Sequence, residues 1–385
     1  MTTPLLFTPI KLRGLALRNR IVVAPMHQYA AVMGFPTDWH LMNAGRYAAG
    51  GAGLVILEST KVERRGCGTL GDLGIWDDAF IPHLKRLADL VKSGGAAVGI
   101  QLGHSGRKSR TGRPWEGGKP LERSAAIEDW EAWELVAPSA IPADANAPVP
   151  RALSTAEVGE VVQAFGRAAV RAHLAGFDTI EIHGAHGFLI HEFLSPQANQ
   201  RTDQYGGSEE NRRRFAVEVA RCVRANWPDD KPLFMRLSVD DDAGWTPANS
   251  IVLARELKAC GVDVIDCSAG GILARPVSST PIGYGYQVPF SRAIREEAGI
   301  LSMAVGLIVH HDQAEQILQD GGADLVALAR EMLYNPNWAL DAARKMGMDA
   351  EFSTVPPAYG WWMQKRAQAM PQLVTSTGHA GGLKA

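Results

Sequence analysis

Several signals that would assign this 385-residue sequence to a specialised class are missing. The formal net charge is only -2, so no basic excess exists to neutralise the phosphates of a nucleic acid. No apolar stretch approaches the ~18 residues that a membrane-spanning helix needs. The opening stretch, "MTTPLLFTPIKLRGL", lacks the apolar core of a signal peptide. We therefore expect a cytoplasmic protein that acts on small molecules, with neither a nucleic-acid nor a membrane partner.

Cysteine is also scarce. The four cysteines are spread along the chain without CxxC spacing: Cys67, Cys222, Cys260 and Cys267. This pattern fits reduced thiols in a cytoplasm and is a poor candidate for a metal site. A GxGxxG segment after a first strand, which would favour an open dinucleotide-binding sheet, is missing as well.

What the sequence does contain is a repeated unit. The segments "GFDTIEI", "GVDVIDC" and "GADLVAL" begin at Gly176, Gly261 and Gly322. Each one reads as a helix that ends on a glycine able to take a positive φ, followed by a buried strand. The preceding helices carry start signals, such as the capping box from Ser154 to Glu157.

Strand-then-helix units of this kind recur along the whole chain. The predicted strands are Ile21–Met26, Leu54–Ser59, Ala97–Leu102, Thr179–His183, Leu233–Leu237, Val264–Cys267, Met303–Val305 and Leu325–Leu328. The predicted helices lie near 39–49, 81–93, 155–175, 208–226, 248–260, 291–298, 311–320 and 337–346. Eight alternating units predict an α/β protein with a single closed (β/α)8 TIM barrel. We expect the barrel to cover residues 1–366 and a loose tail to cover residues 367–385.

Two connections are too long to be plain loops. Residues 103–153 follow the third predicted strand, and residues 268–290 follow the sixth. Both leave the C-terminal face of the barrel, where barrel enzymes build their sites, so both are predicted lids.

Polar residues gather at the predicted C-terminal strand ends, which converge on one cavity in a barrel. These residues are His27, Ser59, Gln101, His104, His183, Arg236 and Arg330. Gly306 follows the seventh strand and Arg330 the eighth, where barrels commonly bind a phosphate through backbone N–H groups. An arginine there would add a charge-assisted contact.

The segment "EIHGAHGFLIHEFLSP", residues 181 to 196, is unusually rich in histidine. A metal site needs several converging ligands, usually with acidic side chains, and Glu181 is the only acidic residue close to His183 and His186. We therefore favour His183 and His186 as donors to a substrate oxygen, and His191 as a packed residue. A metal-dependent barrel hydrolase or lyase that uses His183, His186 and His104 stays open as an alternative.

Five motifs together resemble a known family. They are "RIVVAPM", "LGIWDD", "GIQLGHSGRK", "EIHGAHGFLIHEFLSPQANQRTDQYGGSEENRRRF" and "ALAREML". They look like the Old Yellow Enzyme family of FMN-dependent ene-reductases, and most closely like its bacterial, xenobiotic-reductase-like branch. The resemblance runs in order from about residue 5 to about residue 366.

The resemblance implies FMN across the barrel mouth, reduced by NADPH or NADH. It implies hydride transfer from flavin N5 to the β-carbon of an α,β-unsaturated carbonyl or nitro compound. The implied catalytic residues are His183 and His186, which would hold the substrate oxygen, and Tyr29, which would line the same pocket. The implied FMN-binding residues are Ala24, Pro25, Met26, His27, Ser59, Gln101, Arg236, Gly306, Ala329 and Arg330.

Two residues depart from the family pattern. His27 stands where the branch usually has a flavin-tuning cysteine, and we expect its protonation to raise the flavin potential as pH falls. Phe188 stands where a tyrosine often donates a proton to the α-carbon, which leaves that role to Tyr29 or solvent. A nitro-compound or quinone reductase, which needs no such donor, is therefore an alternative.

The segment "PPAYGWWMQKR" ends the resemblance. Relatives in this branch send a C-terminal residue into the neighbouring subunit's site. Tyr359, Trp361 or Trp362 would do so here, which predicts a homodimer or a larger homo-oligomer.

Overall fold

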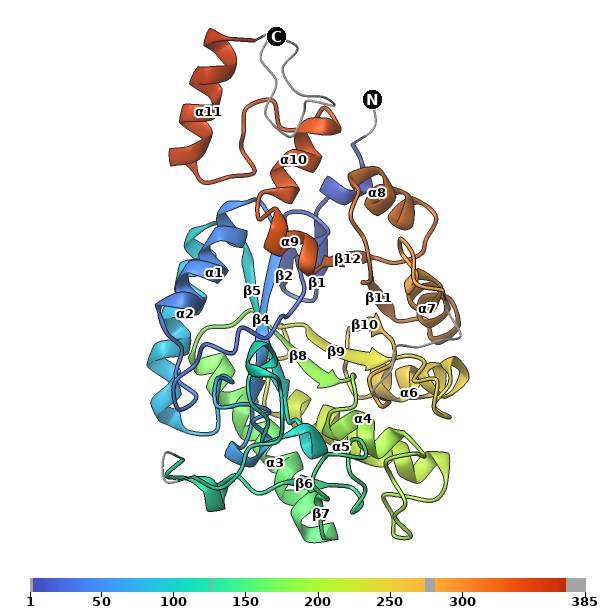
Figure 1. Cartoon of the computed structure of the whole chain (residues 1–385). Coiled ribbons are helices and arrows are strands. Elements are labelled where there is room, and N and C mark those ends of the chain that lie inside the picture. The colour runs from blue at the N-terminus through green and yellow to red at the C-terminus, as the bar shows by residue number, and fades with distance from the viewer. Residues whose placement is uncertain (1–2, 125–126, 274–280, 372–385) are drawn as a thin grey trace.

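The computed structural model describes residues 3–124, 127–273 and 281–371, and its centre is a closed barrel of parallel strands. Neighbours in the barrel follow chain order, and the last strand, β12, pairs with the first, β3. Helices surround the strands (Figure 1). The barrel strands are β3 (Ile21–Val23), β4 (Leu54–Lys61), β5 (Ala97–Gly103), β8 (Thr179–Gly184), β9 (Leu233–Ser238), β10 (Val264–Ser268), β11 (Leu301–Ala304) and β12 (Leu325–Leu328). The predicted (β/α)8 barrel is confirmed.

The helices lie close to where the sequence predicts them. They are α1 (Asp38–Ala49), α2 (Ile81–Ser93), α3 (Thr155–Leu174), α5 (Glu209–Ala225), α6 (Pro247–Ala259), α7 (Val288–Ala293) with a π-helical turn (Ile294–Ala298), α8 (His311–Gln319) and α10 (Trp338–Lys345). The sequence patterns missed α4 (Leu189–Leu194), α9 (Arg330–Tyr334) and α11 (Pro357–Ala369), and the short strands β1 (Ile10–Leu12), β2 (Leu15–Leu17), β6 (Val136–Ala137) and β7 (Arg151–Ala152). Most of these missed elements are too short to show a periodic pattern.

Local signals explain the element boundaries. Ser154 and Glu157 form the predicted capping box at the start of α3. Gly176 and Gly261 have φ values of 84° and 88°, the left-handed conformation expected between a helix and the next strand. In the third unit the prediction was off by one residue: the left-handed position, with φ 67°, is Gly321.

Two barrel strands differ in length from the prediction. β3 ends at Val23, three residues before the predicted end at Met26, because Pro25 has no N–H to continue the ladder. β4 continues past Ser59 to Lys61, whose backbone pairs with Gly103 of β5. This extension carries the Lys61 side chain into the barrel, where it is fully buried.

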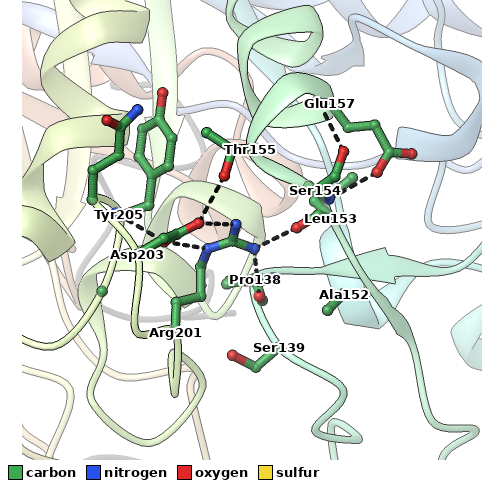
Figure 2. Close-up of polar contacts among 12 residues, drawn as sticks. Pro138, Ser139, Ala152, Leu153, Ser154, Thr155, Glu157, Arg201, Asp203 and Tyr205 are labelled. Carbon is green, nitrogen blue, oxygen red and sulfur yellow. Dashed lines mark hydrogen bonds and ion pairs between the residues drawn. The ribbon is translucent and has the colours of Figure 1, made fainter.

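The long connection after β5 packs as part of the fold. Trp133 is fully buried and packs with Cys67 and Ile127. Arg201, between α4 and α5, donates to the carbonyl oxygens of Pro138 and Leu153, which ties this connection to the neighbouring segment (Figure 2). Its role as a lid stays a prediction. Of the second predicted lid, residues 274–280 lie outside the described residues.

Helix α11 lies apart from the barrel strands, beyond α10 (Figure 1). Gly360 is the only buried residue of this helix. The helix crosses residue 367, the predicted start of the loose tail, and residues 372–385 lie outside the described part of the chain. None of the helices in the described ranges has the length and apolar character needed to cross a lipid bilayer.

Candidate functional site

A cavity of about 430 Å³ opens where β9, β10, β11 and β12 end. It brings together predicted site residues from four connections: His186, Arg236, Gly306, Ala329 and Arg330. This is the C-terminal face, at which the carboxyl ends of all parallel strands in a barrel meet.

One end of this cavity has room for a ligand next to backbone. Gly306 has a φ of 110°, and a Cβ atom there would lie only 2.6 Å from the side-chain amide of Gln287. A side chain there would strain the backbone and would require the Gln287 side chain to move. Arg330, the first residue of α9, lines the same part of the cavity. A glycine backbone beside a guanidinium suits a phosphate group.

Arg236, which lines the same cavity, forms an ion pair with a buried carboxylate. Its Nε atom lies 3.1 Å from Oδ2 of Asp266, the residue beside it in the barrel register. This Nε atom has no hydrogen-bond partner in the described part of the chain, and the side chain is only 9% exposed. A guanidinium with unused donors at a cavity wall is suited to an electron-rich ligand edge.

A second buried carboxyl group lies beside this pair. Gln101 donates to Oε1 of Glu181 at 2.7 Å, and Oε2 of Glu181 has no hydrogen-bond partner. Burial, together with the nearby Asp266, raises the pKa of Glu181 to about 8. Burial also raises the pKa of Asp266, although Arg236 opposes that shift. Glu181 therefore keeps its proton near neutral pH, and Arg236 is the cation beside both carboxyl groups.

His183 and His186 lie together, with ring centroids 5.2 Å apart. Burial first, and then neighbouring cationic groups including Arg236, lower both pKa values well below 6.5. Both imidazoles are therefore neutral. Nδ1 of His183 accepts from the backbone N–H of Ala185 at 3.4 Å, so its Nε2 carries the hydrogen. Nε2 of His186 is hydrogen-bonded to Oγ of Ser268 at 2.7 Å.

The two residues that depart from the family pattern lie next to this pair. The Phe188 ring is 4.9 Å from His183 and 6.1 Å from His27. His27 stacks on Tyr29 at 5.3 Å. Burial, with Asp72 and Glu58, raises the pKa of Tyr29, so its hydroxyl stays protonated.

The remaining predicted residues lie around this group. Ser59 and Gln101 are register partners on β4 and β5, and Gln101 faces Glu181 as described. Ala24 and Met26 line a small cavity of about 30 Å³ that also touches His40 and Glu58. Pro25 lies between them and is half-buried. His191 is a packed residue, as predicted: its Nδ1 accepts from the N–H of Gly187 and it is fully buried.

Lys61 is a site residue that sequence reasoning missed. Its Nζ lies 3.1 Å from Nε2 of His27 and 3.0 Å from Oγ of Ser59. A lysine just after a predicted strand end normally points to solvent, so no signal in the sequence singles it out. Its buried partner Asp72, at 3.5 Å, could not be paired with it from the sequence either.

A model of the NADH:flavin oxidoreductase / NADH oxidase family matches residues 5–348. The chain belongs to this family. It is the Old Yellow Enzyme family that the motifs resemble, so this protein is an NAD(P)H:flavin oxidoreductase. This finding overturns the alternative of a metal-dependent hydrolase or lyase. Within the described ranges, no three His, Cys, Asp or Glu side chains lie together in a way that could hold a metal ion.

This flavin oxidoreductase has similar relatives among characterised proteins. It is 44% identical over 361 residues to NADPH dehydrogenase of Geobacillus sp. (strain WCH70), a match that covers 93% of this chain and 98% of the relative. It is 43% identical over 348 residues to NADPH dehydrogenase of Bacillus subtilis (strain 168), with 89% and 96% covered. The structure of morphinone reductase in complex with tetrahydroNAD matches with a TM-score of 0.73 at 30% identity, covering 90% of this chain and 91% of that one.

The residues present fit a flavin nucleotide. Arg236, Gly306 and Arg330 line one cavity. The two arginines supply positive charge, and Gly306, at a φ of 110°, lets a ligand approach the backbone closely. An arginine suits the electron-rich pyrimidine edge of a flavin, and the glycine with Arg330 suits a terminal phosphate.

Proposed function

We propose that this protein is an FMN-dependent ene-reductase that uses NADPH or NADH to reduce small α,β-unsaturated carbonyl or nitro compounds. When bound, FMN would supply the hydride chemistry, taking hydride from the nicotinamide and passing it from N5 to the β-carbon. The observation that carries the proposal is the neutral His183–His186 pair, whose ring centroids lie 5.2 Å apart, with His186 lining the cavity that Arg236 and Arg330 also line.

The chain's own residues have separate roles in this proposal. His183 and His186 donate to the substrate oxygen, which polarises the C=C bond and stabilises the enolate that develops. Neutral imidazoles suit this role because they donate a hydrogen bond to the oxygen without transferring their proton to it. Arg236 favours the reduced, anionic cofactor, and Gly306 with Arg330 holds its phosphate. Tyr29, a protonated hydroxyl beside His27, supplies the proton to the α-carbon.

A nitro-compound or quinone reductase on the same cofactor is a second candidate. Phe188 favours it, because a phenyl ring next to His183 cannot donate a proton. Substrates whose oxygen atoms take up the electrons need no carbon protonation by the protein.

We also propose that the enzyme works as a homodimer or a larger homo-oligomer. Tyr359, Trp361 and Trp362 on α11 are 52%, 51% and 69% exposed, and aromatic side chains are enriched at subunit interfaces. Light scattering during size-exclusion chromatography tests this, with a Trp361→Ala and Trp362→Ala double variant expected to shift to the monomer. A cytoplasmic location and the lack of membrane and nucleic-acid partners stay predictions.

A visible absorption spectrum taken anaerobically tests the main proposal. We expect oxidised flavin bands that bleach with NADPH and return when 2-cyclohexenone is added. If the bands return only with a quinone or a nitro compound, the second candidate holds. A colourless protein that cannot be reconstituted with FMN would overturn both.

The histidine roles need variants. In His183→Ala and His186→Ala, reoxidation by the enone should slow by about a hundredfold, as when one oxyanion donor is lost. FMN content should stay the same. His311→Asn, which changes a histidine outside the cavity, is the matched control and should behave as wild type.

A further inference from the structure

The ammonium group of Lys61 is fully buried beside the proposed substrate pocket. It is hydrogen-bonded to Nε2 of His27 at 3.1 Å and to Oγ of Ser59 at 3.0 Å, and it forms an ion pair with Oδ2 of Asp72 at 3.5 Å. A lysine is almost never buried unless it is paired in this way. The proposed hydride transfer does not itself use this group.

Lys61 and Asp72 form a buried ion pair, and the surroundings of Asp72 favour its charged form. Thr69 donates its hydroxyl to Oδ1 of Asp72, and the N–H of Gly68 donates to Oδ2. Burial alone would raise the pKa of Asp72, but Lys61 and these donors hold it below its usual value. A neutral Lys61 would leave that carboxylate buried without a counter-charge, which is costly.

A charged ammonium has donors only, so the His27 nitrogen that faces it must be an unprotonated acceptor. The hydrogen of the neutral ring therefore lies on the other nitrogen, Nδ1. That atom has no hydrogen-bond partner among the described residues, and it is not one of the fully enclosed polar atoms. The same ring stacks on Tyr29 and meets the edge of Phe188, so it borders the pocket of His183.

We propose that Lys61 is a positioning residue that fixes His27 as its Nδ1–H tautomer and so turns it into a permanent N–H donor toward the cofactor and substrate. Asp72 and Ser59 hold Lys61 in place. The idea deepens the proposed function, on which its catalytic meaning rests. The tautomer itself depends only on contacts within the chain.

The other influences on His27 either also lower its pKa or raise it too weakly to reverse the shift. Burial and Lys61 lower the pKa of His27 to about 4, and Asp72 opposes them only in part. The titratable and charged groups around the ring are Lys61, Asp72, Tyr29, Glu58, His183, His186 and Lys108. His183 and His186 are neutral, and Lys108 lies beyond the Phe188 ring, 5.8 Å from its centroid.

Nitrogen NMR of protein labelled with ¹⁵N-histidine tests the proposal on the full chain, with and without FMN. The signals of His27 are assigned by their loss in His27→Gln. We expect a protonated Nδ1, an unprotonated Nε2 and no titration between pH 8 and about pH 5.5, given the value of about 4. A protonated Nε2 in the wild type would overturn the proposal.

Variants separate positioning from packing. Lys61→Met alone leaves Asp72 buried without a partner, so the variant for the test is Lys61→Met with Asp72→Asn. We expect His27 to lose its single tautomer, while its titration stays below the neutral range because burial, the largest cause of its low pKa, remains. Lys108→Met, which removes the other lysine that lies against the Phe188 ring, should leave the His27 signals unchanged. Unchanged His27 signals in the double variant would also overturn the proposal.

These outcomes are independent of the proposed function. If the protein binds no flavin but His27 has the expected tautomer, the function fails and the role of Lys61 stands. If the flavin is reduced and then reoxidised by the enone but Nε2 of His27 is protonated, the proposed function stands and the role of Lys61 fails.

Discussion

His186 and Ser268 are joined by a 2.7 Å hydrogen bond between Nε2 and Oγ, although 82 residues separate them in the chain. This bond fixes the orientation of the imidazole, whose backbone is itself strained at a φ of 61°. We expect Ser268→Ala to weaken enone binding by about fivefold, the value of one net hydrogen bond. The apparent Kd from the concentration dependence of flavin reoxidation measures this. Ser268→Thr, which keeps the hydroxyl, should restore affinity in part.

Replacing Arg330 should weaken cofactor binding. The Arg330→Gln variant loses a cation from the cavity that also holds Gly306, so we expect the Kd for FMN to rise at least ~10-fold, as for loss of a charge-assisted contact. Fluorescence titration of the apoprotein with FMN measures this. Arg167→Gln, on the exposed face of α3, is the control and should bind FMN like the wild type. Equal affinity in the two variants would remove Arg330 from the phosphate site.

Near neutral pH, the reduction potential of the flavin should not depend on the protonation of His27. The sequence led us to expect a potential that rises as His27 protonates; because burial and Lys61 lower the His27 pKa to about 4, that rise should occur only well below neutral pH. The imidazole stays neutral above that value. Between about pH 6 and pH 8 the potential should show no inflection that comes from His27. Spectroelectrochemistry over this range checks it, and an extra inflection that disappears in His27→Gln would contradict it.

Restoring a hydroxyl at position 188 should speed enone reduction. A tyrosine there would stand 4.9 Å from His183 at the ring centre, close to where the family places its proton donor. We expect Phe188→Tyr to raise the rate of reoxidation by 2-cyclohexenone at least ~10-fold, at the low end of general acid catalysis. The rate with a quinone should be unchanged. Phe188→Leu, which adds no donor, should not accelerate either substrate.

Glu192 should make the protein less stable as pH rises. It is fully buried, its Oε1 accepts from the N–H of Arg107, and its Oε2 has no partner. Burial raises its pKa to about 8, above the usual value of 4.5. Between these values the unfolded chain has lost the proton that the folded protein keeps. Stability therefore falls as pH rises through this window, by up to about 1.4 kcal/mol for each pH unit.

Glu192→Gln removes that dependence, because an amide mimics the protonated acid and does not titrate. We expect the Tm of the variant, minus the Tm of the wild type, to increase from pH 6 to pH 9. Differential scanning calorimetry at several pH values measures it. Glu160→Gln, at an exposed site on α3, is the control and should track the wild type.

Much of the molecule follows from the sequence because its determinants are local. The capping box at Ser154, the glycines at 176 and 261 and the buried apolar strands each act over a few residues, so the barrel could be predicted. Barrel topology then brings strand ends together, which is why His186, Arg236, Gly306 and Arg330 meet in one cavity.

Tertiary structure alone decided the protonation states and the partners. Lys61 meets His27 across 34 residues of chain, and Gln101 meets Glu181 across 80. No periodicity reports such contacts, since they depend on the register between strands and on which side chain enters the barrel. Desolvation follows from the same packing, and it makes the histidines neutral and keeps Glu181 protonated. The sequence thus points to most of the candidate site residues but not to Lys61, and the protonation states of all of them are set only when the barrel closes around them.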